Sequence, residues 1–336
     1  MSRTLEGRRA ALTTLATAAA ATAAIASPIA AFAQAADAYP NKAIRIIVPF
    51  PAGGTSDTLA RLIGQKFTEA WGQPVIVDNR AGANGNLGAD AVAKAAPDGY
   101  TLVLMDCGNL TISPSLYPKL PFNPVTDFAP VTMFAYSPHL LVVSNKLPVK
   151  TLPELISYVK ANPGKVNYAA AAGTGSAPHL AGVLLAQRAG LDWAYVPYKG
   201  GAQALGDMVG GQVDVTLNGM LATYPFVKAN NVKLLATASE KRLAQEPNVP
   251  TVGESYPGFV TGSWQGILAP ANTPKPIIAK LHDQLIKILA MPDIKEKLAG
   301  QGADPVGNTP EQFAAWTKTE VTTWAKVVKD GNITVD

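Results

Sequence analysis

The sequence has little of what disulfide scaffolds and metal sites require, because its 336 residues include one cysteine and three histidines. Cys107 cannot pair within its own chain, and the apolar stretch "YTLVLMDCG" around it predicts a small buried side chain. The histidines form no cluster with the spacing of metal ligands. A disulfide-rich scaffold is therefore excluded, and we predict neither a metal site nor a cofactor.

Charge and long apolar runs are also scarce. Charged residues make up 15% of the sequence, and the formal net charge of +4 falls to +2 without the three arginines and one glutamate of residues 1–33. Such weak charge gives no basis for binding nucleic acid or an acidic membrane surface. Beyond residue 33, no stretch approaches the about 20 consecutive apolar residues of a transmembrane helix. We therefore predict no nucleic-acid partner and no membrane span.

The N-terminal segment is typical of an export signal. Arg3, Arg8 and Arg9 form a basic start, residues 10–26 are rich in alanine, and residues 31–33 read Ala-Phe-Ala, a small-residue cleavage site. The arginine pair leaves open whether the chain is exported by the twin-arginine route or by the general secretory route. We predict that residues 1–33 are a signal peptide and that the mature chain works in the periplasm.

Strand-like and helix-like patterns alternate along the mature chain. The predicted strands are residues 43–48, 75–77, 101–105, 140–143, 166–171, 193–196, 213–217 and 234–238. Helices are predicted at residues 58–70, 88–95 and 178–189, and again from residue 274 onward, including 310–328. Repeated βα units predict α/β architecture with mostly parallel sheets. Residues 106–139, rich in Pro, Ser and Asn, are predicted to be an irregular connection.

Two glycine-rich loops each join a predicted strand to a predicted helix. They contain Gly53, Gly54, Thr55 and Ser56 in "VPFPAGGTSD", and Gly173, Thr174, Gly175 and Ser176 in "AGTGSAPH". Glycine lets the backbone approach a ligand closely, and the hydroxyls either cap the helix or donate hydrogen bonds. Ordinary helix caps and turns are the alternative. If both loops face one cleft, two helix N-termini can hold the same anion.

The residues of these loops favour a carboxylate over a polyphosphate. Neither loop contains Lys or Arg, and Asp57 beside the first would repel a highly charged ligand. Two enzyme alternatives fit less well. Asp78 imitates the ribose-binding acid of a dinucleotide fold, but the G-x-G-x-x-G spacing is absent. Ser176 and His179 suggest a secreted hydrolase, but the G-x-S-x-G elbow is absent.

Six segments, in one order, carry a resemblance to a known family. They are "YPNKAIRIIVPFPAGGTSDTLAR", "VIVDNRAGANGNLGADAVAKAAPDGYTLVL", "TDFAPVTM", "AAGTGSAPHLAG", "VPYKGGAQALGDMVGGQVDV" and "PVGNTPEQFAAW". From about Tyr39 to the C-terminus the chain resembles the substrate receptors of tripartite tricarboxylate transporters, the Bug-type periplasmic binding proteins. The resemblance implies a hinge-closing receptor that captures a small organic acid and delivers it to a membrane permease, and we expect a monomer.

The resemblance also implies an architecture and a ligand site. We expect a type II periplasmic-binding-protein fold: residues 34–143 plus 245–336 form domain 1 and residues 144–244 form domain 2, with crossings at 140–143 and 238–245. One ligand carboxylate should lie between the first loop, Phe50–Asp57, and the second loop, Gly173–His179. The first loop would contribute Phe50 as an apolar wall and Ala52 beside it. In the second, Ser176 is the strongest hydroxyl candidate.

Asn218 departs from the family pattern. Many relatives have a Phe-Asp pair where this chain has Leu217-Asn218, and an acid there would suit an amino or amide group. Because the Asn218 side chain is neutral, we predict a ligand without a cationic amine: a dicarboxylate, a tricarboxylate or an aromatic acid. Lys199 could complement a distal carboxylate or lie in solvent, and Trp264 could border the cleft or pack in the core. A sensor that binds the same ligand remains an alternative to a transport receptor.

Overall fold

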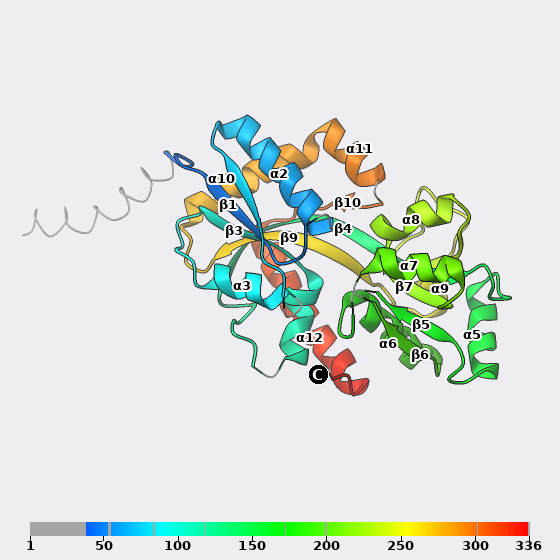
Figure 1. The fold of residues 1–336 in the computed structure, drawn as a ribbon. Helices are drawn as coiled ribbons and strands as arrows, with labels where there is room; N and C mark the ends of the chain where they lie inside the picture. The colour runs from blue at the N-terminus through cyan, green and yellow to red at the C-terminus, as the bar shows by residue number, and fades with distance from the viewer. Residues whose placement is uncertain are drawn as a thin grey trace, which may run out of the picture.

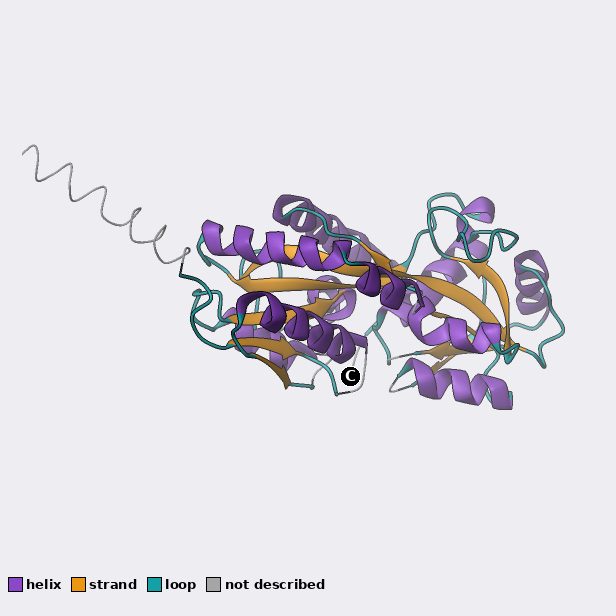
Figure 2. Ribbon diagram, turned by 90° about the horizontal axis from the view of Figure 1, so that it is seen from above, coloured by secondary structure: helices purple, strands orange, loops and turns teal. Residues whose placement is uncertain are grey.

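The computed structural model describes residues 38–52, 55–82, 85–117, 119–171, 173–198, 200–300 and 302–334. The predicted signal peptide lies outside these residues. They form two α/β lobes joined by long strands that run from one lobe into the other (Figures 1 and 2). Ten strands hydrogen-bond in the order β2-β1-β3-β9-β4-β7-β5-β6, with β8 and β10 also paired to β4. The predicted two-domain α/β fold class is confirmed.

The first lobe is built from both ends of the described chain. Its strands are β1 (Ile44–Val48), β2 (Val75–Asn79), β3 (Thr101–Asp106), β9 (Gly262–Pro270), β10 (Asp304–Pro305) and the first part of β4 (Phe128–Ser144). Its helices are α2 (Thr55–Trp71), α3 (Asn86–Ala93), the π-helix η2 (Gly108–Ile112), α4 (Ser113–Leu116), α10 (Lys275–Ala290), α11 (Pro292–Gly300) and α12 (Pro310–Asp330). Strands β1, β2 and β3 are parallel, whereas β9 is antiparallel to β3 and β4.

The second lobe repeats this pattern on a smaller scale. It contains β5 (Asn167–Ala170), β6 (Ala194–Pro197), β7 (Val215–Gly219), β8 (Val232–Thr237) and the end of β4, with helices α5 (Leu152–Ala161), α6 (Ala177–Ala189), α7 (Gly201–Gly210), α8 (Met220–Lys228) and α9 (Val252–Ser255). Strands β5, β6 and β7 are parallel, and β4 is antiparallel to β7 and β8. Both sheets are therefore mixed and not mostly parallel as predicted, because β4 and β9 are antiparallel to their neighbours. The parallel pairs are among the outer strands.

Helices cover both faces of each sheet because neighbouring strand residues point to opposite faces. In β1, Ile46 packs with the buried residues of α2, α10 and α11, whereas Ile47 packs with those of α3, η2 and α12. In β4, Leu141 faces the α5 and α6 side of the second lobe and Leu140 faces α7 and α8. The carboxyl ends of β1, β3 and β7 lie at the junction between the lobes, because Pro49, Asp106 and Gly219 line the same cavity.

The prediction of an irregular connection at residues 106–139 was wrong. Seventeen residues, Phe128–Ser144, form strand β4, the longest strand of the described chain. Pro130 and Pro138 made the stretch unlike a strand, since proline cannot donate to a strand ladder. The structure accommodates Pro130 at a register shift, and at Pro138 the pairing with β9 ends and that with β7 begins.

The two lobes are joined where β4 and the start of β9 meet. His139 N–H donates to Thr261 O at 3.0 Å, and its carbonyl accepts from Ala238 N–H at 2.8 Å. Val252 and Phe259 pack in the second-lobe core with Leu141. We propose that the second crossing lies near Thr261, later in the chain than the predicted crossing at 238–245.

Candidate functional site

A cleft of about 800 Å³ opens between the lobes, a volume typical of small-molecule sites. Residues from both lobes line it: Pro49, Phe50, Pro51, Ala52, Ser56, Ala81, Gly82, Gly85, Asp106, Cys107, Gly108, Ser137, Ser176, Ala177, Pro178, Gly200, Gly201, Ala202, Asn218, Gly219, Leu221, Ala222, Ser263 and Gln265. Both predicted loops contribute to this set. The N-terminal ends of α6 and α7 therefore open into one cavity that α2 also borders through Ser56.

The first loop is held in place by the neighbouring strand β2. Asn79 Nδ2 donates to Phe50 O at 3.0 Å, which fixes the loop where β1 ends. Phe50 and Ala52 line the cleft, and Phe50 also packs against the first-lobe core, so both of its alternative roles are compatible with its position. Gly53 and Gly54, as well as the side chain of Thr55, lie outside what the structure describes.

Ser56 and Asp57 follow one another at the start of α2 but have different surroundings. Ser56 is 5% exposed and lines the cleft, and among the described residues no group bonds to its hydroxyl. Asp57 is buried beside Arg61, whose Nε and Nη2 lie 3.0 and 2.9 Å from its carboxylate oxygens. The guanidinium balances the charge of Asp57, so its repulsion of an anion is weaker than the sequence suggested.

In the second loop, Ser176 is the N-cap of α6. Its hydroxyl lies 2.8 Å from Ala171 O and 2.7 Å from Gly173 O, and it accepts from His179 N–H at 3.4 Å. Ser176 and Ala177 also line the cleft. The Ser176 hydroxyl is thus already engaged in the loop, whereas the first backbone N–H groups of a helix have no partner within it.

Thr174 and His179 lie in a different hollow, formed by α6 and the end of α12. The ring of His179 accepts from Gly175 N–H at 3.0 Å and stacks edge-on to Tyr195 at 4.8 Å. Burial lowers the pKa of His179 to about 4, so the ring is neutral at pH 7. Because its imidazole bonds to the backbone rather than to Ser176, the two side chains do not form the nucleophile–base pair of the hydrolase alternative.

The N-terminus of α7 was not singled out from the sequence as part of the anion site. Gly200, Gly201 and Ala202 line the cleft, and no side chain caps this helix. Asn218, at the end of β7, also lines the cleft and donates from Nδ2 to Thr223 Oγ1 at 3.1 Å. A Cβ on Gly201 would lie 2.7 Å from Asn218 Nδ2, so a larger residue here would displace the Asn218 amide. The strand–glycine–helix pattern of "VPYKGGAQAL" is the signal that would have identified it.

Four polar residues at the base of the cleft were also missed. Asp106 ends β3, Ser263 and Gln265 lie on β9, and Ser137 lies on β4. Burial raises the pKa of Asp106 to about 6. No sequence motif marks these residues: Asp106 follows the predicted strand 101–105 but begins no glycine–hydroxyl loop, β9 was not predicted, and β4 was predicted only from Leu140 onward.

The remaining candidates that the structure describes fall outside the cleft. Lys199 lies outside the described residues. Trp264 packs in the first-lobe core, as in the second of its two alternatives. Asp78 pairs with Arg45 and Arg80 at 3.1 and 3.0 Å and is not among the residues that line the cleft. Within the described chain, no group of three or more His, Cys, Asp or Glu side chains could hold a metal ion.

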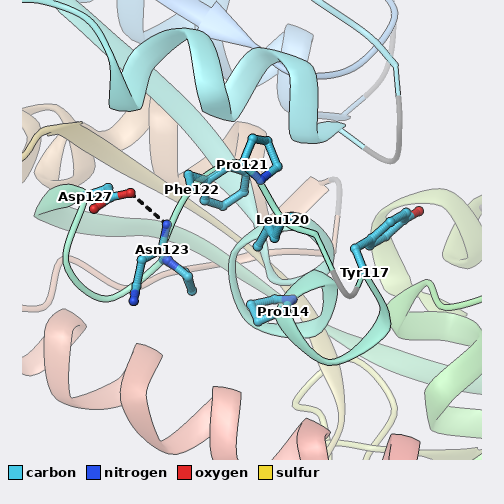
Figure 3. A pocket seen from close by; sticks show the side chains of 8 residues that line it. Pro114, Tyr117, Leu120, Pro121, Phe122, Asn123 and Asp127 are labelled. Carbon is cyan, nitrogen blue, oxygen red and sulfur yellow. Dashed lines mark hydrogen bonds between the residues drawn. The ribbon is translucent and has the colours of Figure 1, made fainter.

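A separate hollow of about 470 Å³ lies on the first lobe between α4 and β4 (Figure 3). Proline and aromatic side chains line most of it, including Pro114, Tyr117 and Phe122. Its acid is engaged locally, since Asp127 Oδ2 accepts from Asn123 N–H at 2.7 Å (Figure 3). Unlike the cleft, this hollow is lined by residues of one short segment, and none of the predicted loop residues lines it.

None of the described helices is both long enough and apolar enough to cross a membrane. Residues 59–333 match the family described as tripartite tricarboxylate transporter family receptor. BugT of Bordetella pertussis is 39% identical over 312 residues, which cover 92% of this chain and 94% of BugT.

Solved structures of similar proteins agree with this match. An R. palustris protein solved with adipate is 35% identical, with a TM-score of 0.81 over 88% of this chain and 99% of that one. MatC of Rhodopseudomonas palustris, solved with bound malate, is 36% identical, with a TM-score of 0.77 over 86% of this chain and all of that one. The chain therefore belongs to the receptor family of the tripartite tricarboxylate transporters, a family of solute-binding proteins.

Proposed function

We propose that the chain is a periplasmic receptor that captures a small organic carboxylate and delivers it to the membrane permease of a tripartite tricarboxylate transporter. One ligand carboxylate lies between the first and second loops, and the lobes close around it by a hinge motion. The observation that carries this proposal is the presence of helix N-termini from both lobes at one cleft, because such ends favour anions.

The polar groups of the cleft suit a carboxylate. The free hydroxyl of Ser56, the N-terminal N–H groups of α6 and the uncapped N-terminus of α7 are donors, and no Lys or Arg is among the described lining residues. Neutral donors of this kind can hold a carboxylate, whereas a polyphosphate would need compensating positive charge. The adipate and malate bound to similar proteins are acids of this class.

Delivery to a permease and a periplasmic location rest on the family and on the predicted signal peptide. A receptor of a tripartite transporter meets its permease at the outer face of the membrane, which requires export of the chain. Mass spectrometry of the protein recovered from the periplasm of an expressing cell should show a mature N-terminus near residue 34. Retention of residues 1–33 in the cytoplasm would contradict the location.

A thermal-shift screen tests the ligand class. Chain expressed with its own N-terminal segment is purified and heated with mono-, di- and tricarboxylates, aromatic acids, amino acids, phosphates and nucleotides. Ligands that bind the folded state raise the melting temperature, and we expect a group of carboxylates to do so. Shifts with phosphates or nucleotides alone, or no shift across the panel, would reject the carboxylate receptor.

A further inference from the structure

Asp106 and Gln265 form a polar pair at the base of the cleft. They lie directly opposite each other on the antiparallel strands β3 and β9. Side chains of opposed residues in such a pair point to the same face of the sheet, with Cβ atoms about 5 Å apart. That face also carries Leu104 and Ile267, which pack in the core beneath α2 and α10. Both Asp106 and Gln265 line the cleft.

In this pair, one carboxylate oxygen and one side-chain amide have no hydrogen-bond partner among the described residues. Asp106 Oδ1 accepts from Gly108 N–H at 2.8 Å and from Asn109 N–H at 3.2 Å, at the start of η2. Among the described residues, no group donates to Oδ2. The side-chain amide of Gln265 likewise has no bonded partner in the described chain, although the residue is only 5% exposed. The pair therefore offers one free acceptor beside one free amide.

Among the described residues that line the cleft, Asp106 has the one charged side chain. Burial raises its pKa to about 6, so it is ionised at pH 8 and increasingly protonated below pH 6. An ionised carboxylate in this position gains most from a ligand group that donates a hydrogen bond to it. A second ligand carboxylate placed there would instead meet like charge.

We propose that Asp106 and Gln265 determine ligand specificity by selecting a carboxylate that carries a hydroxyl group on its distal half. The hydroxyl donates to Asp106 Oδ2 and accepts from the Gln265 amide, while the ligand carboxylate lies at the helix N-termini. This proposal rests on the proposed function and narrows its ligand class. It is compatible with Asn218, because a hydroxyl is neutral.

Matched pairs of acids test the proposal by titration calorimetry at pH 8. Each pair differs by one hydroxyl: malate and succinate, 4-hydroxybenzoate and benzoate, 6-hydroxyhexanoate and hexanoate. We expect the hydroxyl member of at least one pair to bind wild type at least ten-fold more tightly. Asp106→Asn keeps an oxygen for the two backbone N–H groups but replaces the free acceptor with a donor, so the ratio should fall to one or below.

Two further variants separate this role from a structural one. Gln265→Leu removes the amide and should reduce the binding of the hydroxyl member more than that of the plain acid. Asp192→Asn makes the same chemical change as Asp106→Asn at an exposed residue outside the cleft and should leave the ratio unchanged. Circular dichroism of each variant checks that it folds, and Asp106→Ser, which retains a capping oxygen, replaces Asp106→Asn if that variant does not fold.

The outcomes distinguish the two proposals. If acids bind but no pair reaches a ten-fold preference, or if Asp106→Asn keeps the preference, the specificity role is rejected and the receptor stands. If no acid of any kind binds wild type, both proposals are rejected. At pH 5, where Asp106 is largely protonated in the free protein, the preference for the hydroxyl member should shrink relative to pH 8.

Discussion

At the scale of single residues, two serine hydroxyls in similar sequence contexts have different hydrogen-bond partners. Ser56 and Ser176 both follow a glycine-rich loop at the start of a helix. The Ser176 hydroxyl is satisfied by two carbonyls and a backbone N–H, whereas that of Ser56 has no bond to a described residue. Ser56, rather than Ser176, is therefore the side chain whose hydroxyl is available to a ligand.

Alanine substitutions should separate the two serines. Ser56→Ala should weaken carboxylate binding by about 1–3 kcal/mol, the effect of losing a donor to a charged group. Ser176→Ala should lower the free energy of unfolding by about 1 kcal/mol through loss of its cap, and affect binding less. Urea denaturation and calorimetry measure the two effects.

Thr151→Ala is the matched control for the cap, because Thr151 caps α5 and does not line the cleft. It should lower stability as much as Ser176→Ala without changing affinity. Equal affinities of Ser56→Ala and wild type would show that the Ser56 hydroxyl does not contact the ligand.

At the scale of elements, the crossing of β4 and β9 depends on a buried histidine. The two ring nitrogens of His139 lie 3.1 Å from the hydroxyl oxygens of Thr261 and Ser263. The residue is 0% exposed, and burial lowers the pKa of its ring to about 3. The neutral ring therefore bonds β4 to Thr261, just before β9, and to Ser263 of β9.

This histidine should make the fold sensitive to acid. Above pH 6.5 the ring is neutral in both the folded and unfolded states, so its contribution to stability is complete. As pH falls from 6.5 towards 3, the unfolded state takes up a proton and the folded state does not. The free energy of unfolding should then fall by about 1.4 kcal/mol per pH unit from this residue alone.

Comparison with His139→Gln isolates the contribution of His139 to the pH dependence of stability. The comparison is needed because Asp106, whose pKa is raised to about 6, stabilises the fold as pH falls through part of this range. Denaturation at pH 8, 6 and 4 should show the variant losing less stability than wild type as pH falls. Parallel losses in the two proteins would mean that His139 is protonated in the fold or that other groups dominate.

At the scale of the whole molecule, the lobes share a core as well as two strand crossings. Leu180 and Val183 of α6 belong to the second lobe but pack with Trp324, Val327 and Val328 of α12 (Figure 1). Other residues of the same helix, such as Leu185, pack in the second lobe's own core. We therefore infer that contact with α12 orients α6 so that its N-terminus faces the cleft.

Two leucine substitutions on α6 test this role. Leu180→Ala and Leu185→Ala each remove a fully buried side chain and should lower the free energy of unfolding by about 2–5 kcal/mol. Leu180→Ala should also weaken ligand binding, although Leu180 does not line the cleft. If both variants bind the same ligand equally well, contact with α12 does not position the α6 N-terminus.

Local patterns were enough to predict much of the fold and part of the site. Alternating strand and helix periods placed β1, β3, α2 and α6, and glycine beside hydroxyls identified both loops, because these features depend on residues close together in the chain. The positions of Phe50, Ala52, Ser56, Ser176 and Asn218 at the cleft agree with the loops and strand end from which they were chosen. Their roles in binding stay predictions.

The sequence by itself determined the βα series, the glycine-rich loops and the family. Only the tertiary structure decided that β4 continues through two prolines, that His139 bonds to Thr261 and Ser263, and that Asp106 faces Gln265. The contacting residues are more than a hundred positions apart in the chain, so no local sequence pattern predicts these contacts. Strand pairing and burial set the chemistry of such residues, and both depend on which distant segments meet.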